Sequence, residues 1–138
     1  MKKRLNCVML IDDDEDDNYF HQVVLKKMDF ANHIEIAEGG PEALDYLKRE
    51  KDVPDIIFLD INMPGMNGWD FLEEYKKLTA SQKKSVIIIM LTTSISPLDK
   101  KNAENIPEIS SFYSKPMTQE MLLDILDQYF PDEKNGAV

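Results

Sequence analysis

Apolar residues along the chain gather in five short blocks, separated by longer stretches that mix apolar and polar positions. Four of the blocks are too short for helices, and three are almost entirely apolar, as expected for strands covered on both faces. They are residues 7–11, 34–37, 56–59, 86–91 and 112–113. Strands alternating with helices in this way predict an α/β fold, a parallel sheet with helices on both of its faces.

The stretches between the blocks show the three-to-four spacing of apolar residues that is typical of amphipathic helices. The clearest covers residues 121–130, and Thr118 is suited to be its N-cap. Pro41 and Pro97 fit the first turns of the second and fourth helices, where a missing N–H costs little. We expect residues 76–85 to form a surface loop.

Length and composition narrow the class of protein. The 138 residues are enough for one globular domain. A formal charge of −10 disfavours binding to nucleic acid, whose phosphates it would repel. The single cysteine, Cys7, excludes a disulfide within the chain. The sequence contains neither a signal peptide nor a long apolar span, so we expect no membrane insertion and a cytoplasmic location.

Polar residues that directly follow the apolar blocks should meet in one crevice, beyond the carboxyl ends of the strands. They are Asp12, Asp13, Asp60, Thr92 and Lys115. Crowded carboxylates repel one another, and a hard cation such as Mg²⁺ relieves that repulsion. A carboxylate can also attack phosphorus when metal and ammonium charges offset the negative charge of the phosphoryl group. The set therefore suits a divalent cation together with a phosphoryl group.

Four motifs identify a family. They are Ile11-Asp12-Asp13 and the segments 58–68, 90–94 and 112–116, all in order and at specific spacing. With them the chain, over about residues 5–130, resembles the receiver domain of two-component response regulators of the chemotaxis-regulator type. The resemblance implies a flavodoxin-like, doubly wound (βα)5 sandwich whose five-stranded parallel sheet has the order 2-1-3-4-5.

By the same resemblance, Asp60 accepts a phosphoryl group from a phosphohistidine of a partner kinase. Mg²⁺ (or Mn²⁺) would be bound by Asp13, Asp60 and the backbone carbonyl of Asn62, with Asp12 acting mainly through a metal-bound water. Lys115 would pair with Asp60 or with its phosphate. None of these positions is missing from the sequence, so a degenerate receiver is not expected.

The resemblance also implies a switch. Thr92 would turn inward on phosphorylation, and Phe112 would follow into the space that Thr92 leaves. Because Phe112 has no hydroxyl, packing alone would hold its inward state. The change would reshape the face made by the fourth helix, fifth strand and fifth helix, which binds a downstream protein or a second copy of the chain. The Lys115–Pro116 peptide bond is expected to be cis.

Some acidic and basic residues have simpler interpretations. Asp14, Asp16 and Asp17 could belong to the acidic site, or they could simply lie at a helix N-terminus, where the helix dipole favours acidic side chains. Both interpretations stay open. His21 and His33 have no partner at metal-ligand spacing, so we expect them on the surface.

The resemblance therefore indicates a single-domain response regulator, with a short polar tail at residues 131–138 and no output domain. It would not be an enzyme beyond its own phosphorylation and dephosphorylation. Its partners would be a sensor histidine kinase or a histidine phosphotransfer protein, and a downstream protein. The alternatives are a structural scaffold and a Mg²⁺-dependent phosphohydrolase that forms an aspartyl phosphate. The phosphohydrolase needs a second Asp where this chain has Asn62.

Overall fold

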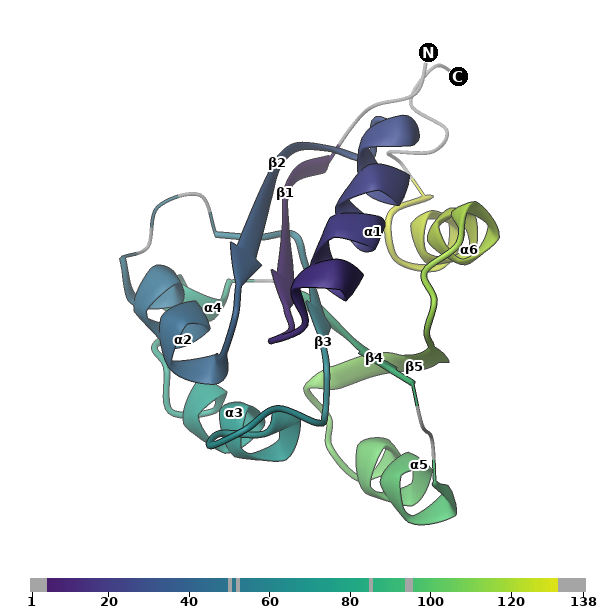
Figure 1. Cartoon of the computed structure of the whole chain (residues 1–138). Coiled ribbons are helices and arrows are strands. Elements are labelled where there is room, and N and C mark those ends of the chain that lie inside the picture. The colour runs from purple at the N-terminus through teal and green to yellow at the C-terminus, as the bar shows by residue number, and fades with distance from the viewer. Residues whose placement is uncertain (1–4, 50, 52, 85, 94–95, 132–138) are drawn as a thin grey trace.

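A computed structural model describes residues 5–49, 51, 53–84, 86–93 and 96–131. Its centre is a sheet of five parallel strands in the order β2-β1-β3-β4-β5, which confirms the predicted flavodoxin-like topology (Figure 1). The strands are β1 (Leu5–Ile11), β2 (Ala31–Ala37), β3 (Ile56–Leu59), β4 (Ile87–Thr92) and β5 (Ile109–Ser114). Ser94 and the predicted tail beyond Pro131 lie outside the described residues.

Helices cover both faces of the sheet. They are α1 (Glu15–Lys27), α2 (Gly40–Lys48), α3 (Gly68–Tyr75), α4 (Ala80–Lys83), α5 (Pro97–Glu104) and α6 (Gln119–Tyr129). Pro41 and Pro97 lie in the first turns of α2 and α5, and the Thr118 hydroxyl accepts a hydrogen bond from the Met121 N–H, as predicted.

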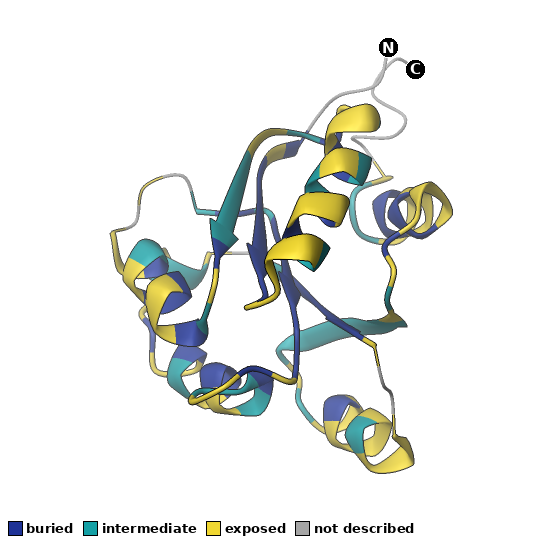
Figure 2. Cartoon of the chain, in the orientation of Figure 1, coloured by how far each residue is buried: buried dark blue, intermediate teal, exposed yellow. Residues whose placement is uncertain are grey.

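Alternate residues of each central strand enter two separate hydrophobic clusters, because successive side chains point to opposite faces of a sheet. Val8 and Leu10 of β1 pack with apolar residues of α1 and α6. Met9 and Ile11 of the same strand pack with residues of α2 and α3. The strands at the centre of the sheet are therefore buried on both faces, as the coloured ribbon shows (Figure 2).

The segment of residues 76–85, which was expected to be a loop, contains the short helix α4. Thr79 and Gln82 form a capping box that starts it: the Gln82 N–H donates to Thr79 Oγ1 at 3.3 Å, and the Thr79 N–H donates to Gln82 Oε1 at 2.9 Å. Among the helices in the described ranges, none is both long and apolar enough to cross a membrane.

Gly68 fixes the turn that follows β3 and so holds the end of that strand in place. Its N–H donates to the Ile61 carbonyl at 2.8 Å, and Asn67 caps α3 directly before it. A Cβ atom at position 68 would lie 2.6 Å from the Asp60 carbonyl oxygen, which is backbone and cannot easily move aside. The chain passes too close to Asp60 here for any side chain.

We predict that Gly68→Ala lowers the free energy of unfolding by about 1–3 kcal/mol, the usual cost of overpacking. Gly39→Ala is the matched control, because a Cβ atom there would meet only Pro41 Cδ, at an ordinary 3.8 Å. The control should lose less than about 1 kcal/mol. Urea unfolding of both variants measures the difference, and equal stability of the two would contradict this account of the turn.

Candidate functional site

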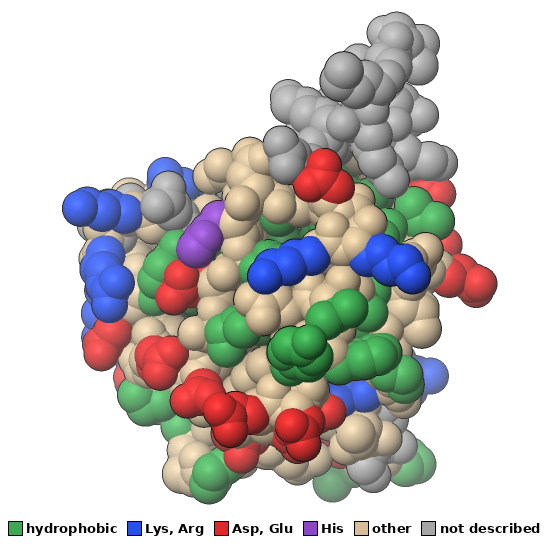
Figure 3. Space-filling model, turned by 45° about the horizontal axis from the view of Figure 1, so that its top comes forward, with side chains coloured by type: hydrophobic (Ala, Val, Ile, Leu, Met, Phe, Trp, Pro, Cys, Tyr) green, Lys and Arg blue, Asp and Glu red, His purple; other side chains and the backbone are tan. Residues whose placement is uncertain are grey.

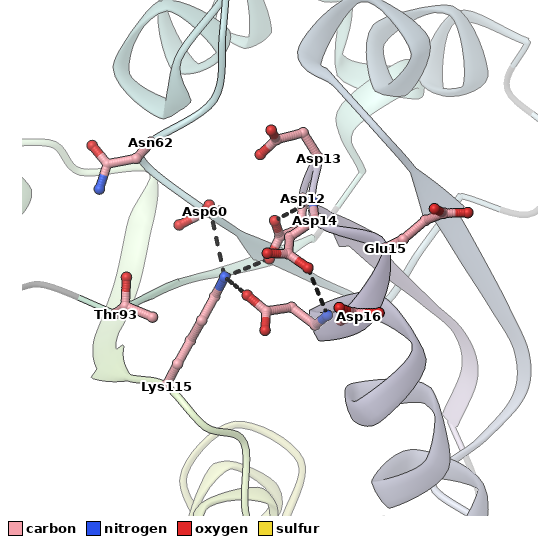
Figure 4. Close-up of a pocket in the computed structure, with 10 residues that line it drawn as sticks. Asp12, Asp13, Asp14, Glu15, Asp16, Asp60, Asn62, Thr93 and Lys115 are labelled. Atoms are coloured by element: carbon pink, nitrogen blue, oxygen red, sulfur yellow. Dashed lines mark hydrogen bonds and ion pairs between the residues drawn. The ribbon is translucent and has the colours of Figure 1, made fainter.

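An acidic crevice lies at the carboxyl ends of β1, β3 and β5 (Figure 4). Backbone hydrogen bonds between neighbouring elements hold its floor: Asp60 N–H to the Ile11 carbonyl at 3.0 Å, and Lys115 N–H to the Thr92 carbonyl at 2.8 Å. The residues that line it are Asp12, Asp13, Asp14, Glu15, Asp16, Asp17, Asp60, Asn62, Thr93 and Lys115.

Three carboxylates meet in this crevice as the sequence predicts. Asp12 and Asp60 are buried, Asp13 is exposed, and one oxygen of each lies within 4.8 Å of the others. Mg²⁺ prefers oxygen ligands and usually keeps several of its waters, which suits carboxylates with one member open to solvent. The residues present therefore fit a divalent cation.

The Lys115 ammonium lies among these carboxylates, 2.6 Å from Asp12 Oδ2, 2.8 Å from Asp17 Oδ2 and 3.7 Å from Asp60 Oδ2 (Figure 4). Burial alone would lower the pKa of Lys115, but its hydrogen bonds to Asp12 and Asp17 raise that pKa above its usual value. Lys115 is therefore a permanent positive charge at this site. Its peptide bond to Pro116 is cis.

The remaining predicted residues lie around this centre. Asn62 is exposed at the mouth of the crevice, where Figure 4 shows it on the side away from α1. Thr92 is completely buried at the end of β4, and its hydroxyl acts on the neighbouring Asp60 carboxylate, opposing the rise in pKa that burial causes there. It is Thr93 that lines the crevice. Phe112 is half-buried against the cluster shared by α2 and α3.

Three polar residues of α1 complete the site: the role of Asp17 was left open by the sequence, and Asn18 and His21 were not assigned to the site. Asp17 binds Lys115, and Asn18 donates from Nδ2 to the Asp12 carbonyl at 2.8 Å. The predicted surface position of His21 is wrong, because only 3% of this residue is exposed. Burial and the Lys115 ammonium lower the pKa of His21. Asn18, His21 and Leu25 recur at helical spacing on the buried face of α1, a signal that the sequence did contain.

Comparison with known proteins decides the family. The family model of the response regulator receiver domain matches residues 8–127. The chain belongs to this family. Its members are signalling domains that typically bind Mg²⁺ at an acidic pocket, and this receiver contains an acidic cluster of Asp12, Asp13 and Asp60.

The receiver is also similar to specific proteins. It is 29% identical over 118 residues to the sensory/regulatory protein RpfC of Xanthomonas campestris pv. campestris, covering 86% of this chain but 16% of that protein. The crystal structure of a two-component response regulator from Cytophaga hutchinsonii matches with a TM-score of 0.83 and 29% identity, covering 91% of this chain and 97% of the other. The structure of the Vibrio cholerae chemotaxis protein CheY4 matches with a TM-score of 0.73 and 29% identity, covering 90% of this chain and 98% of the other. The predicted chemotaxis-regulator-like receiver is thus confirmed.

The folded receiver disfavours the ionised form of Asp60. Burial raises its pKa, and the Asp12 carboxylate raises it further, while Lys115 opposes both effects. Because the folded state binds this proton more tightly than the unfolded state, the stability contributed by protonated Asp60 is lost as pH rises through the raised pKa. Above that raised pKa, the ionised side chain therefore destabilises the metal-free fold.

We predict that Asp60→Asn raises the metal-free free energy of unfolding at pH 7, by about 0.5–2 kcal/mol, the usual range for a single stabilising change. The gain should shrink as the pH is lowered, because Asp60 itself then becomes neutral. Asp13→Asn, which neutralises the exposed member of the cluster, should have a smaller effect. Urea unfolding in a metal chelator measures all three proteins. An Asp60→Asn variant less stable than wild type would contradict this view.

Proposed function

We propose that Asp60 accepts a phosphoryl group from a phosphohistidine of a sensor histidine kinase or a histidine phosphotransfer protein, in the cytoplasm. The observation that carries this proposal is the meeting of buried Asp60 with Asp12, Asp13 and the Lys115 ammonium in one crevice. A carboxylate is an adequate nucleophile for phosphorus only where positive charge offsets the approach of two anions.

The proposed reaction is a displacement at phosphorus. A carboxylate oxygen of Asp60 forms the new P–O bond while the P–N bond of the phosphohistidine breaks. The electron pair of that bond remains on the imidazole nitrogen, which then takes up a proton. Lys115 Nζ, 3.7 Å from Asp60 Oδ2, would donate to a phosphoryl oxygen and offset part of its charge.

Asp13, Asp60 and the backbone carbonyl of Asn62 would hold Mg²⁺ or Mn²⁺, with Asp12 placed to bind one of its waters. When bound, the cation neutralises charge on the phosphoryl oxygens during transfer. The exposure of Asp13 and Asn62 supports this division, because it leaves the cation open to water and to the incoming group on one side. Buried Asp12 is already engaged with Lys115 at 2.6 Å.

The approach of a partner protein is supported by the surface next to the crevice. Tyr19, Phe20 and Val23 of α1 are exposed by 70%, 48% and 44%, and they follow directly on the acidic turn that lines the site. In Figure 3 hydrophobic side chains gather on one face, with acidic ones below them and lysine or arginine side chains above. A kinase that brings its phosphohistidine to the crevice would cover this apolar surface. Exposed apolar patches of this kind often mark sites of contact with another protein.

The response to phosphorylation is proposed to run through Thr92 and Phe112. The Thr92 hydroxyl, buried beside Asp60 and already interacting with that carboxylate, would donate to a phosphoryl oxygen on Asp60. Its inward movement would let Phe112 pack deeper and would reshape the face made by α5, β5 and α6. Helices α5 and α6 are the fourth and fifth of the helices predicted from the sequence, which did not include the short α4. This face would bind a downstream protein or form a homodimer.

The phosphohydrolase alternative receives less support. Its chemistry requires an acid or base two residues beyond the nucleophile, and the amide of Asn62 at that position cannot exchange a proton usefully. Steady turnover of small phosphate esters would be the sign of such an enzyme.

We predict that acetyl phosphate adds one phosphoryl group to the wild-type protein in the presence of Mg²⁺, seen as a single adduct by intact-protein mass spectrometry. A chelator should abolish the adduct, because the negative charges of nucleophile and donor would then repel each other. Asp60→Asn should show no adduct, while circular dichroism reports an intact fold. An adduct on Asp60→Asn would contradict the assignment of Asp60.

A further inference from the structure

The Lys115 ammonium has a partner that phosphoryl transfer to Asp60 does not require. Asp17 Oδ2 lies 2.8 Å from Lys115 Nζ, whereas Asp60 Oδ2 lies 3.7 Å away. Only the shorter distance is that of a hydrogen bond. In the structure the ammonium is therefore held closer to the first turn of α1 than to the proposed phosphoacceptor.

The helix dipole does not account for this contact. Glu15, Asp16 and Asp17 all lie in the first turn of α1, where the dipole favours an acidic side chain at each position. Glu15 and Asp16 are exposed, and among the described residues Lys115 has no ion pair with either of them. Asp17 is half-buried and reaches across 98 residues of sequence to bind the ammonium. The dipole explains an acid in this turn, but not why one of the three contacts Lys115.

Burial divides the partners of Lys115 into two kinds. The side chains of Asp12 and Asp60 are only 6% and 9% exposed, and that of Asp17 is 35% exposed. If the ammonium left Asp12, an unpaired carboxylate would remain in a buried place, which is strongly unfavourable. If it left Asp17, water could solvate the carboxylate that remained. Asp17 is therefore the partner that Lys115 can give up most easily.

We propose that Asp17 is a positioning residue, which holds Lys115 on the α1 side of the crevice at rest and releases it when a phosphoryl group occupies Asp60. This inference rests on the proposed function of Asp60. A phosphoryl group carries about −1.5 to −2 charges in place of the single charge of the Asp60 carboxylate, and places them nearer the ammonium, so it draws Lys115 away from its weakest partner. Asp17 competes for the same ammonium, so its carboxylate opposes engagement of the phosphoryl group and favours the resting state.

The test uses beryllofluoride, a mimic of the phosphoryl group, titrated at saturating Mg²⁺ and followed by amide NMR spectra. Asp17→Asn keeps the shape of the side chain but removes its charge. It should bind the mimic about twofold to fivefold more tightly than wild type, the fold-change expected for the loss of one partly exposed ion pair. Asp16→Asn is the matched control, with the same charge change in the same turn, and should alter the affinity by less than about twofold.

A double-mutant cycle distinguishes positioning from a general effect of charge. In a Lys115→Ala background the substitution Asp17→Asn should no longer change affinity for the mimic, because the ammonium that both groups share is gone. Asp17→Glu, which retains the carboxylate, should bind more like wild type than Asp17→Asn does.

The inference is overturned if Asp17→Asn binds the mimic no more tightly than Asp16→Asn, or if its gain persists without Lys115. Failure of the proposed function gives a different result: the folded wild-type protein would then bind no beryllofluoride in the presence of Mg²⁺.

Discussion

One ammonium shares a crevice with carboxylates that outnumber it, and this imbalance of charge governs the site. Lys115 is within ion-pair distance of Asp12, Asp17 and Asp60, while Asp13 adds a further negative charge at the mouth. Burial raises the pKa of Asp60, and the excess of negative charge adds to that rise through Asp12. A divalent cation would relieve the imbalance, and in the account proposed here it would also make Asp60 able to attack a phosphoryl group.

The parallel sheet is what makes such crowding possible. Strands β1 and β3 pair directly and end together, which brings Asp12 and Asp60 to one edge from positions far apart in sequence. Hydrogen bonds join the backbone across strands at this edge, and Gly68 packs closely against the Asp60 carbonyl. Repulsion among the acids therefore cannot be relieved by moving the backbone. A side chain that water can reach, such as Asp17, can instead change its contacts when the charge in the crevice changes.

Much of this arrangement could be predicted from the sequence because it depends on local patterns. The apolar blocks locate the strands, and the polar residues after them locate the crevice. Strand β5 is longer than its apolar block, because an edge strand that is only partly buried can include serines. Helix α4 was missed although its Thr79–Gln82 capping box is visible in the sequence. The contact between Asp17 and Lys115 could not be predicted, because it depends on how α1 and β5 are packed in space.

The central claim is that Asp60 receives its phosphoryl group from a histidine, and transfer between proteins tests it most directly. A histidine phosphotransfer protein, labelled with radioactive phosphate on its histidine, would be mixed with this receiver and Mg²⁺. The account predicts that the label moves to the receiver as an alkali-labile acyl phosphate, and that peptide mapping places it on Asp60. Label that remained on histidine across a panel of such donors, or that moved to another residue, would contradict it.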